Sequence, residues 1–150
     1  MNAEEFETLF LQTIHNRNNR FHPLVWINGE PEIGSGTCIG GFSEVYAKNA
    51  IVSIGCDCDI ASFVAINVDD SHMRCIGLSE KNNCADIVIG DCVFIGSHSV
   101  ILGGATIGHH SVIAAGTVVR GGVIPPYSLV VGNPMVVKPG YYLASGRSTL

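Results

Sequence analysis

The stretch IVIGDCVFIGSHSVILGGATIGHHSVIAAGTVVR, residues 87–120, repeats itself every six positions. An aliphatic residue followed by a small one recurs through it, as in Ile89-Gly90, Ile95-Gly96 and Ile107-Gly108. A short fixed period is the signature of a repeat architecture, in which each unit buries its apolar residue only by stacking on its neighbours. The repeat is therefore the feature that decides the fold.

The same register extends in both directions from this stretch. The aliphatic positions expected to point inward are Ile89, Ile95, Ile101, Ile107, Ile113 and Val119, continuing through Pro125 to Val131 and Val137. Four residues after successive aliphatic positions stand small or β-branched residues, also expected inside: Val93, Ser99, Ala105, Ser111, Thr117 and Val123. An earlier block has the same pattern, with three extra residues after its third member: Ile33, Ile39, Val45, Ile54, Ile60 and Ile66.

Each six-residue unit predicts one short strand and one corner, so that three units close a triangular coil of about 18 residues. Stacked coils bury the aliphatic column and pair every strand with those above and below. A glycine after the aliphatic residue allows the close approach of backbone at the corner. The sequence predicts an all-β protein, a single-stranded parallel β-helix of about five coils between Ile33 and Val137.

Residues 2–15 lie outside the repeat and have helical spacing. Their apolar positions are Phe6, Leu9, Phe10 and Ile14. Asn2 is a suitable N-cap with Glu5 three residues on, so a short helix is expected to cap the first coil.

The length of 150 residues indicates a single domain. We expect an N-terminal helix and cap over residues 1–30, the β-helix over 31–138, and a C-terminal tail over 139–150.

The stretch VDDSHMRCIGLSEKNNCAD, residues 68–86, is polar and lacks the period. It is predicted to leave the coil as an extruded loop, and long loops on regular scaffolds usually serve function. His72, near its start, is a candidate general base because imidazole titrates near neutral pH. Either Asp69 or Asp70 is close enough in sequence to orient the ring.

Composition excludes several classes of function. A net charge of -5 with eight Lys plus Arg provides no basic stripe for nucleic acid. No stretch approaches the roughly 18 apolar residues of a membrane span. The acidic start MNAEEFETLF does not resemble a secretory signal, and the six cysteines are expected to be free thiols, so a cytoplasmic location is predicted.

The loop motif DSH, residues 70–72, and the segments VFIGSHSVI, IAAGTVV and PPYSLVVGNP together carry a resemblance over about residues 30–138. The chain resembles the hexapeptide-repeat acetyltransferases of the maltose, galactoside and polysaccharide O-acetyltransferase type. The resemblance implies a left-handed β-helix and transfer of acetyl from acetyl-CoA to a hydroxyl of a saccharide. It also implies a homotrimer with active sites between subunits.

Site residues follow from the same resemblance. His72 stands at the position of the catalytic histidine, with Asp70 beside it, and Ser97 and Ala115 stand where the family contacts the acyl-CoA near its thioester and pantetheine arm. Lys138 stands near the basic residue that approaches the CoA phosphate.

Three departures from the family pattern affect the transfer of these roles. Phe94 replaces a frequent Trp, which leaves acceptor preference open, and Lys138 follows GNP at an unusual distance. The tail shows no closing helix, although Arg147 offers another cation for a phosphate.

The sequence leaves three alternative functions. N-acetylation of a nucleotide-linked amino sugar requires the same parts. A zinc carbonic anhydrase-like protein would use outward histidines such as His98, His109 and His110, but their spacing does not match, and no metal site is expected. A structural β-helix without activity is the third alternative.

Overall fold

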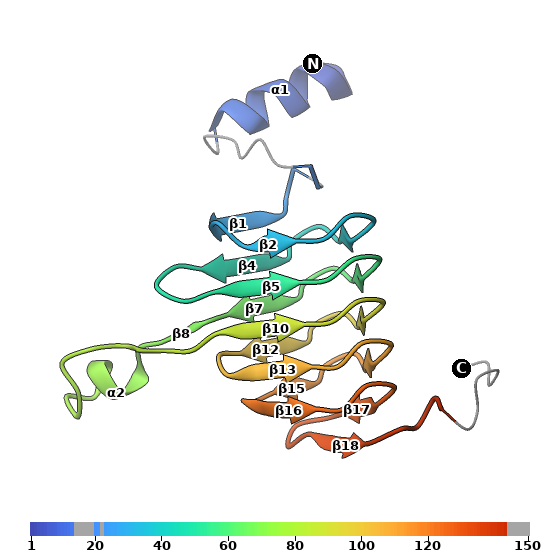
Figure 1. Ribbon diagram of the computed structural model, residues 1–150. Helices are drawn as coiled ribbons and strands as arrows, with labels where there is room; N and C mark the ends of the chain where they lie inside the picture. The colour runs from blue at the N-terminus through green and yellow to red at the C-terminus, as the bar shows by residue number, and fades with distance from the viewer. Residues whose placement is uncertain (14–19, 22, 144–150) are drawn as a thin grey trace.

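The computed structural model describes residues 1–13, 20–21 and 23–143. The chain winds into a triangular coil whose three faces are parallel sheets, here called faces A, B and C (Figure 1). Face A contains β1 Trp26–Gly29, β4 Glu44–Ala47, β7 Ala65–Asn67, β12 Val100–Leu102 and β15 Val118–Val119. Face B contains β2 Glu32–Ile33, β5 Val52–Ile54, β10 Ile87–Ile89, β13 Ala105–Ile107 and β16 Gly122–Ile124. Face C contains β3 Cys38–Ile39, β6 Asp59–Ile60, β11 Phe94–Ile95, β14 Val112–Ile113, β17 Leu129–Val131 and β18 Val136–Lys138.

The strands follow one another in the order A, B, C through five coils, and β18 then pairs antiparallel with β17. In Figure 1 the strands of face B run to the right in front and those of face A run to the left behind, while the chain descends. This direction of winding is left-handed, and the predicted β-helix of about five coils is confirmed. The first coil begins at Trp26, inside the stretch that was expected to form only a cap.

The inward column predicted from the repeat forms the core. Its fully buried members in the middle coils are Ile89, Ile95, Ile101, Ile107, Ile113 and Val119. The predicted second column is buried as well at Val93, Ser99, Ala105, Ser111 and Thr117. Ser99 and Ser111 satisfy their hydroxyls by donating to backbone carbonyls of the next coil, which is what allows polar side chains to be buried there.

Glycine is required where successive coils come into close contact. A Cβ on Gly96 would lie 2.4 Å from the amide nitrogen of Ala115, and one on Gly108 would lie 2.3 Å from the nitrogen of Pro126. Both distances are shorter than atoms tolerate, so the glycine of the hexapeptide follows from steric exclusion between coils.

The predicted register is wrong in the last coil. Ile107 pairs with Ile124, and Ile113 pairs with Val130, so this coil is one residue shorter than the one above it. The buried residues are therefore Ile124 and Val130, whereas Val123 is 77% exposed and Val131 is 39% exposed. Pro125 is exposed and Val137 only half-buried. The residue is lost at the corner Arg120–Gly121, where strand pairing across coils overrides the local period.

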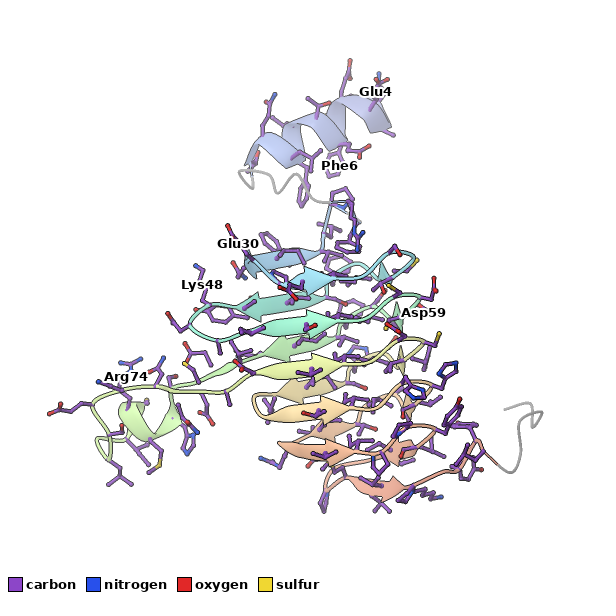
Figure 2. The ribbon with its side chains drawn as sticks, in the orientation of Figure 1. Glu4, Phe6, Glu30, Lys48, Asp59 and Arg74 are labelled. Carbon is purple, nitrogen blue, oxygen red and sulfur yellow. The ribbon has the colours of Figure 1, made fainter. Side chains whose placement is uncertain are left out.

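The N-terminal helix α1 spans Ala3–Thr13, shorter than predicted, and Ile14 lies outside the described residues. Its predicted N-cap is confirmed, because Asn2 and Glu5 each accept a hydrogen bond from the backbone N–H of the other. Phe6 points toward the first coil (Figure 2), but none of the described residues of α1 is buried. The helix therefore does not cap the core as expected. Neither α1 nor α2 is long and apolar enough to cross a bilayer, and these are the described helices.

Candidate active site

The extruded loop predicted at residues 68–86 leaves the coil between β7 and β10 and projects away from it (Figure 1). Its base is an antiparallel hairpin of β8 Asp69–Asp70 and β9 Asn83–Cys84, and its tip contains the one-turn helix α2 His72–Cys75. Sequence patterns missed both elements, which are too short to show a period. The hairpin fixes the start of the loop against the coil and so gives His72 a defined position.

His72 is paired with Asp70. The Nδ1 atom of His72 lies 2.6 Å from Oδ1 of Asp70, and the same oxygen accepts the backbone N–H of His72 at 3.0 Å. The His72 backbone N–H, followed by its ring, lowers the pKa of the Asp70 carboxyl. An ionised carboxylate only accepts hydrogen bonds, so it fixes the ring with its proton on Nδ1 and leaves Nε2 with a free lone pair. Both side chains are more than half exposed and accessible to a ligand.

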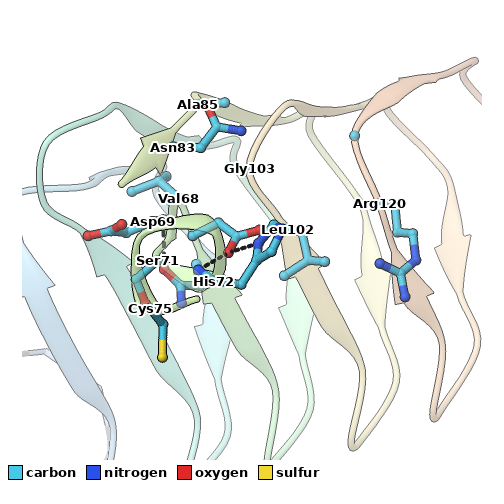
Figure 3. A pocket seen from close by; sticks show the side chains of 13 residues that line it. Val68, Asp69, Ser71, His72, Cys75, Asn83, Ala85, Leu102, Gly103 and Arg120 are labelled. Carbon is cyan, nitrogen blue, oxygen red and sulfur yellow. Dashed lines mark hydrogen bonds and ion pairs between the residues drawn. The ribbon is translucent and has the colours of Figure 1, made fainter. Parts of the chain in front are cut away.

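Asp69 occupies a different environment. It pairs across the hairpin with Cys84, and its side chain points away from His72 (Figure 3). Burial, followed by the charge of Asp69, raises the pKa of the Cys84 thiol, which therefore stays protonated. Asp70 is thus the acid that contacts the histidine, a choice that the sequence left open.

An open cleft of about 620 Å³ lies between the loop and the coil (Figure 3). Gly103 lines it where the loop comes closest, and a Cβ there would lie 3.0 Å from the carbonyl oxygens of Val68 and Ala85. Arg120, two coils below the loop, supplies an exposed cation to the same cleft. Sequence reasoning missed Arg120, because its proximity to the loop depends on how the coils stack. The complete lining is Asn67, Val68, Asp69, Asp70, Ser71, His72, Cys75, Asn83, Ala85, Leu102, Gly103, Arg120 and Gly121.

Ser97 and Ala115 lie elsewhere on the prism. They occupy the corner between faces C and A, called the CA corner, in successive coils, whereas His72 belongs to the corner between faces A and B. The carbonyl of Ser97 accepts the N–H of Gly116 at 2.9 Å, so the two corner segments are in direct contact. Ser97 is half-buried and Ala115 exposed, and neither residue lines the cleft at His72. One chain by itself therefore does not bring all the predicted site residues together.

The remaining predicted contacts lie on face C. Lys138, in β18, is exposed, and its Nζ lies 5.8 Å from the centre of the Tyr141 ring. Phe94 is 40% exposed and is not part of the cleft lining. Arg147 lies outside the described residues.

Within residues 1–13, 20–21 and 23–143, the remaining histidines and cysteines form no metal centre. His109 and His110 place their Nδ1 atoms 2.9 Å apart. No group of three or more metal-binding side chains occurs among the described residues. All six cysteines are free, as expected, and Cys58 is 2% exposed in the core.

Comparison with known proteins finds matches among bacterial transferases with hexapeptide repeats. The family model "Bacterial transferase hexapeptide (six repeats)" matches residues 86–121. A curated relative, 2,3,4,5-tetrahydropyridine-2,6-dicarboxylate N-succinyltransferase of Xylella fastidiosa (strain 9a5c), is 29% identical over 122 residues. The match covers 72% of this chain and 40% of the relative, so the chain spans well under half the length of that protein.

Solved structures provide further matches. The hexapeptide-repeat acetyltransferase VCA0836 of Vibrio cholerae O1 biovar eltor, in complex with acetyl-CoA, superposes with a TM-score of 0.68 at 26% identity, covering 91% of this chain and 76% of that one. The polysialic-acid-specific acetyltransferase NeuO gives a TM-score of 0.64 at 28% identity, covering 77% and 61%. Galactoside acetyltransferase in complex with coenzyme A gives 0.61 at 28%, covering 84% and 68%.

The fold is a left-handed β-helix of the hexapeptide-repeat type, and the extruded loop with His72 projects from it. Residues 86–121 match the bacterial transferase hexapeptide repeat, and the resemblance of the chain to hexapeptide-repeat acetyltransferases is confirmed.

Proposed function

We propose that this chain is an acetyl-CoA-dependent acyltransferase that acetylates a hydroxyl of a saccharide, with His72 as general base. The observation that carries the proposal is the His72–Asp70 pair at the mouth of the cleft. Two of the similar structures hold acetyl-CoA or coenzyme A, and two of the similar proteins are named for sugar or polysaccharide substrates.

The reaction uses the free lone pair on Nε2 of His72. Nε2 takes the proton from the acceptor hydroxyl as its oxygen attacks the thioester carbonyl carbon of acetyl-CoA. The carbon–sulfur bond breaks, and the imidazolium returns the proton to the departing thiolate. Asp70 holds the ring through Nδ1–H and stabilises the transient positive charge. Atoms and charge balance, with an acetyl ester and free CoA as products.

We assign the acetyl-CoA to the CA corner, because Ser97 and Ala115 occupy successive turns there and Gly116, beside Ala115, is exposed and leaves open space. A thin pantetheine arm fits along the outer surface of these two turns, which are themselves in direct contact. Lys138 and Arg120 are the cations proposed to meet its phosphates, since both are exposed.

The saccharide hydroxyl is our first choice of acceptor and an amino group is the second. The relative that is an N-succinyltransferase favours the second, because it shows that a similar chain transfers an acyl group to nitrogen. Thiol release from acetyl-CoA, measured against sugars and nucleotide-linked amino sugars, tests the function. An acetyl ester is labile to hydroxylamine and an amide is not, so the product distinguishes the two acceptors. Absence of both turnover and acetyl-CoA binding would contradict the proposal and favour a structural role.

We propose a homotrimer, because one chain does not bring the proposed site residues together and the resemblance to hexapeptide-repeat acetyltransferases implies three subunits. The loop tip exposes Ile76 by 64% and Leu78 by 68%, and a loop with uncovered apolar side chains needs a partner surface. We propose that His72 of one chain faces the acyl-CoA bound at the CA corner of the next. The expected mass in light scattering is three times the 15.9 kDa of the chain. An active monomer would contradict the shared site. The cytoplasmic location stays a prediction.

Asp70→Asn is expected to lower kcat by about 10-fold or more, with KM for acetyl-CoA unchanged. The amide no longer stabilises the imidazolium and also accommodates the wrong ring tautomer. Because the folded-state pKa of Asp70 is lowered, the carboxylate interaction is present at neutral pH and is lost only as pH falls through that lowered value. Steady-state kinetics at neutral pH measure the effect. Asp69→Asn is the matched control, and a larger loss of kcat there would reverse the assignment.

A further inference from the structure

Three rings form a ladder along the CA corner. Phe42, Phe63 and His98 occupy equivalent turn positions in the first three coils. The Phe42 and Phe63 ring centres lie 5.0 Å apart with planes 7° from parallel, and those of Phe63 and His98 lie 4.9 Å apart at 11°. The ladder thus runs parallel to the axis of the β-helix, with one ring for each coil.

The fold does not require rings at these positions. All three residues have left-handed backbone conformations, with φ of 64°, 61° and 60°, which bulky side chains rarely adopt. The equivalent residue of the fourth coil is Gly116, with φ of 71°, and it makes the same turn without strain. Phe42 is 55% exposed and Phe63 49% exposed, so burial does not compensate for the conformation.

The ladder ends at an open position beside the proposed acetyl-CoA site. Apart from Gly116's chain neighbours, no described heavy atom lies within 4 Å of a Cβ placed on that residue. Its chain neighbour Ala115, and Ser97 beside His98, are the proposed acetyl-CoA contacts. One face of the His98 ring is covered by Phe63, and the other faces the coil of Gly116, which has no ring to stack on it.

We propose that His98 is a positioning residue for the acyl donor, and that its uncovered face stacks on a planar group of acetyl-CoA, the thioester or the adjoining pantetheine amide. Both groups are flat and conjugated, and they can stack on an aromatic ring at the distance that separates successive rings of the ladder. The ligand thus occupies the next position in the stack, which is empty because Gly116 has no side chain. Phe63 holds the imidazole from the opposite side. The inference rests on the proposed function and adds a residue that the family comparison did not suggest.

Two variants separate stacking from proton transfer. His98→Ala removes the ring, and KM for acetyl-CoA is expected to rise about 3- to 10-fold with kcat changed less than about 3-fold. His98→Phe keeps a flat ring without a titratable nitrogen, and is expected to restore KM to near the wild-type value. His110→Ala is the matched control, because His110 also has a left-handed backbone (φ 56°) and stacks on Tyr127 at 5.0 Å, but on the corner between faces B and C.

Acetyl-CoA binding by calorimetry accompanies the kinetics, with thermal unfolding to verify the fold of each variant. An unchanged KM and Kd in His98→Ala, with wild type active, would overturn the inference alone. A large loss of kcat in both His98 variants would also overturn it, because His98 would then be acting as a proton carrier. Wild-type protein that neither binds nor turns over acetyl-CoA would overturn the proposed function and this inference together.

Discussion

Replacement of His72 by alanine is expected to lower kcat by about 10²- to 10⁴-fold, the usual contribution of a general base. The reason is that Nε2 of His72 is the proposed proton acceptor, and His72 is the only histidine among the described residues that line the cleft. KM for acetyl-CoA should change little, because Ser97 and Ala115 lie at a different corner. Thiol release under saturating acetyl-CoA measures the effect.

The fold should survive this change. His72 is 63% exposed, and its ring contacts the carboxylate of Asp70. Circular dichroism and light scattering of the variant should therefore match the wild type, and His110→Ala, a histidine outside the cleft, should keep full activity. A well-folded His72→Ala trimer with normal turnover would refute the mechanism while leaving the β-helix unaffected.

Truncation of Ile124 to alanine is expected to lower the free energy of unfolding by about 2–5 kcal/mol, the range for large-to-small changes in a packed core. Ile124 is 2% exposed and stacks directly below Ile107 in the shortened last coil. Denaturant unfolding at one fixed protein concentration measures the change, since oligomer stability depends on concentration.

Val123→Ala provides the matched control, because Val123 is 77% exposed in the same strand and its truncation should cost less than about 0.5 kcal/mol. The strict six-residue register predicts the reverse, with Val123 inside. A larger loss from Val123→Ala than from Ile124→Ala would therefore support the uninterrupted repeat against the observed register.

The sequence by itself determined the fold class and the position of the extruded loop. The period of six places an aliphatic residue in the same direction on each strand, and a chain with this pattern buries them only by coiling. Residues 68–86 lack the six-residue period, so they cannot form strands of the coil and must leave it as a loop. The capping pair Asn2 and Glu5 was also predictable, because it depends on three residues of local spacing.

Only the tertiary structure decided the register of the last coil and the partner of His72. The loss of one residue at Arg120–Gly121 becomes visible through pairing with the coil above. The choice between Asp69 and Asp70 depends on which side of the hairpin each faces, and side chains of adjacent strand residues alternate. The phase of that alternation is set by how the hairpin docks on the coil.

The ladder of Phe42, Phe63 and His98 shows the same limit at longer range. Its members stand 21 and 35 residues apart in the sequence, since a three-residue step and the extruded loop separate them. Local pattern specifies that each residue occupies a turn, but contact between turns depends on the total length of chain in each coil. The repeat alone does not specify which turn residues of different coils contact one another. The stacking of coils determines these contacts, because strand pairing fixes which corners lie above one another.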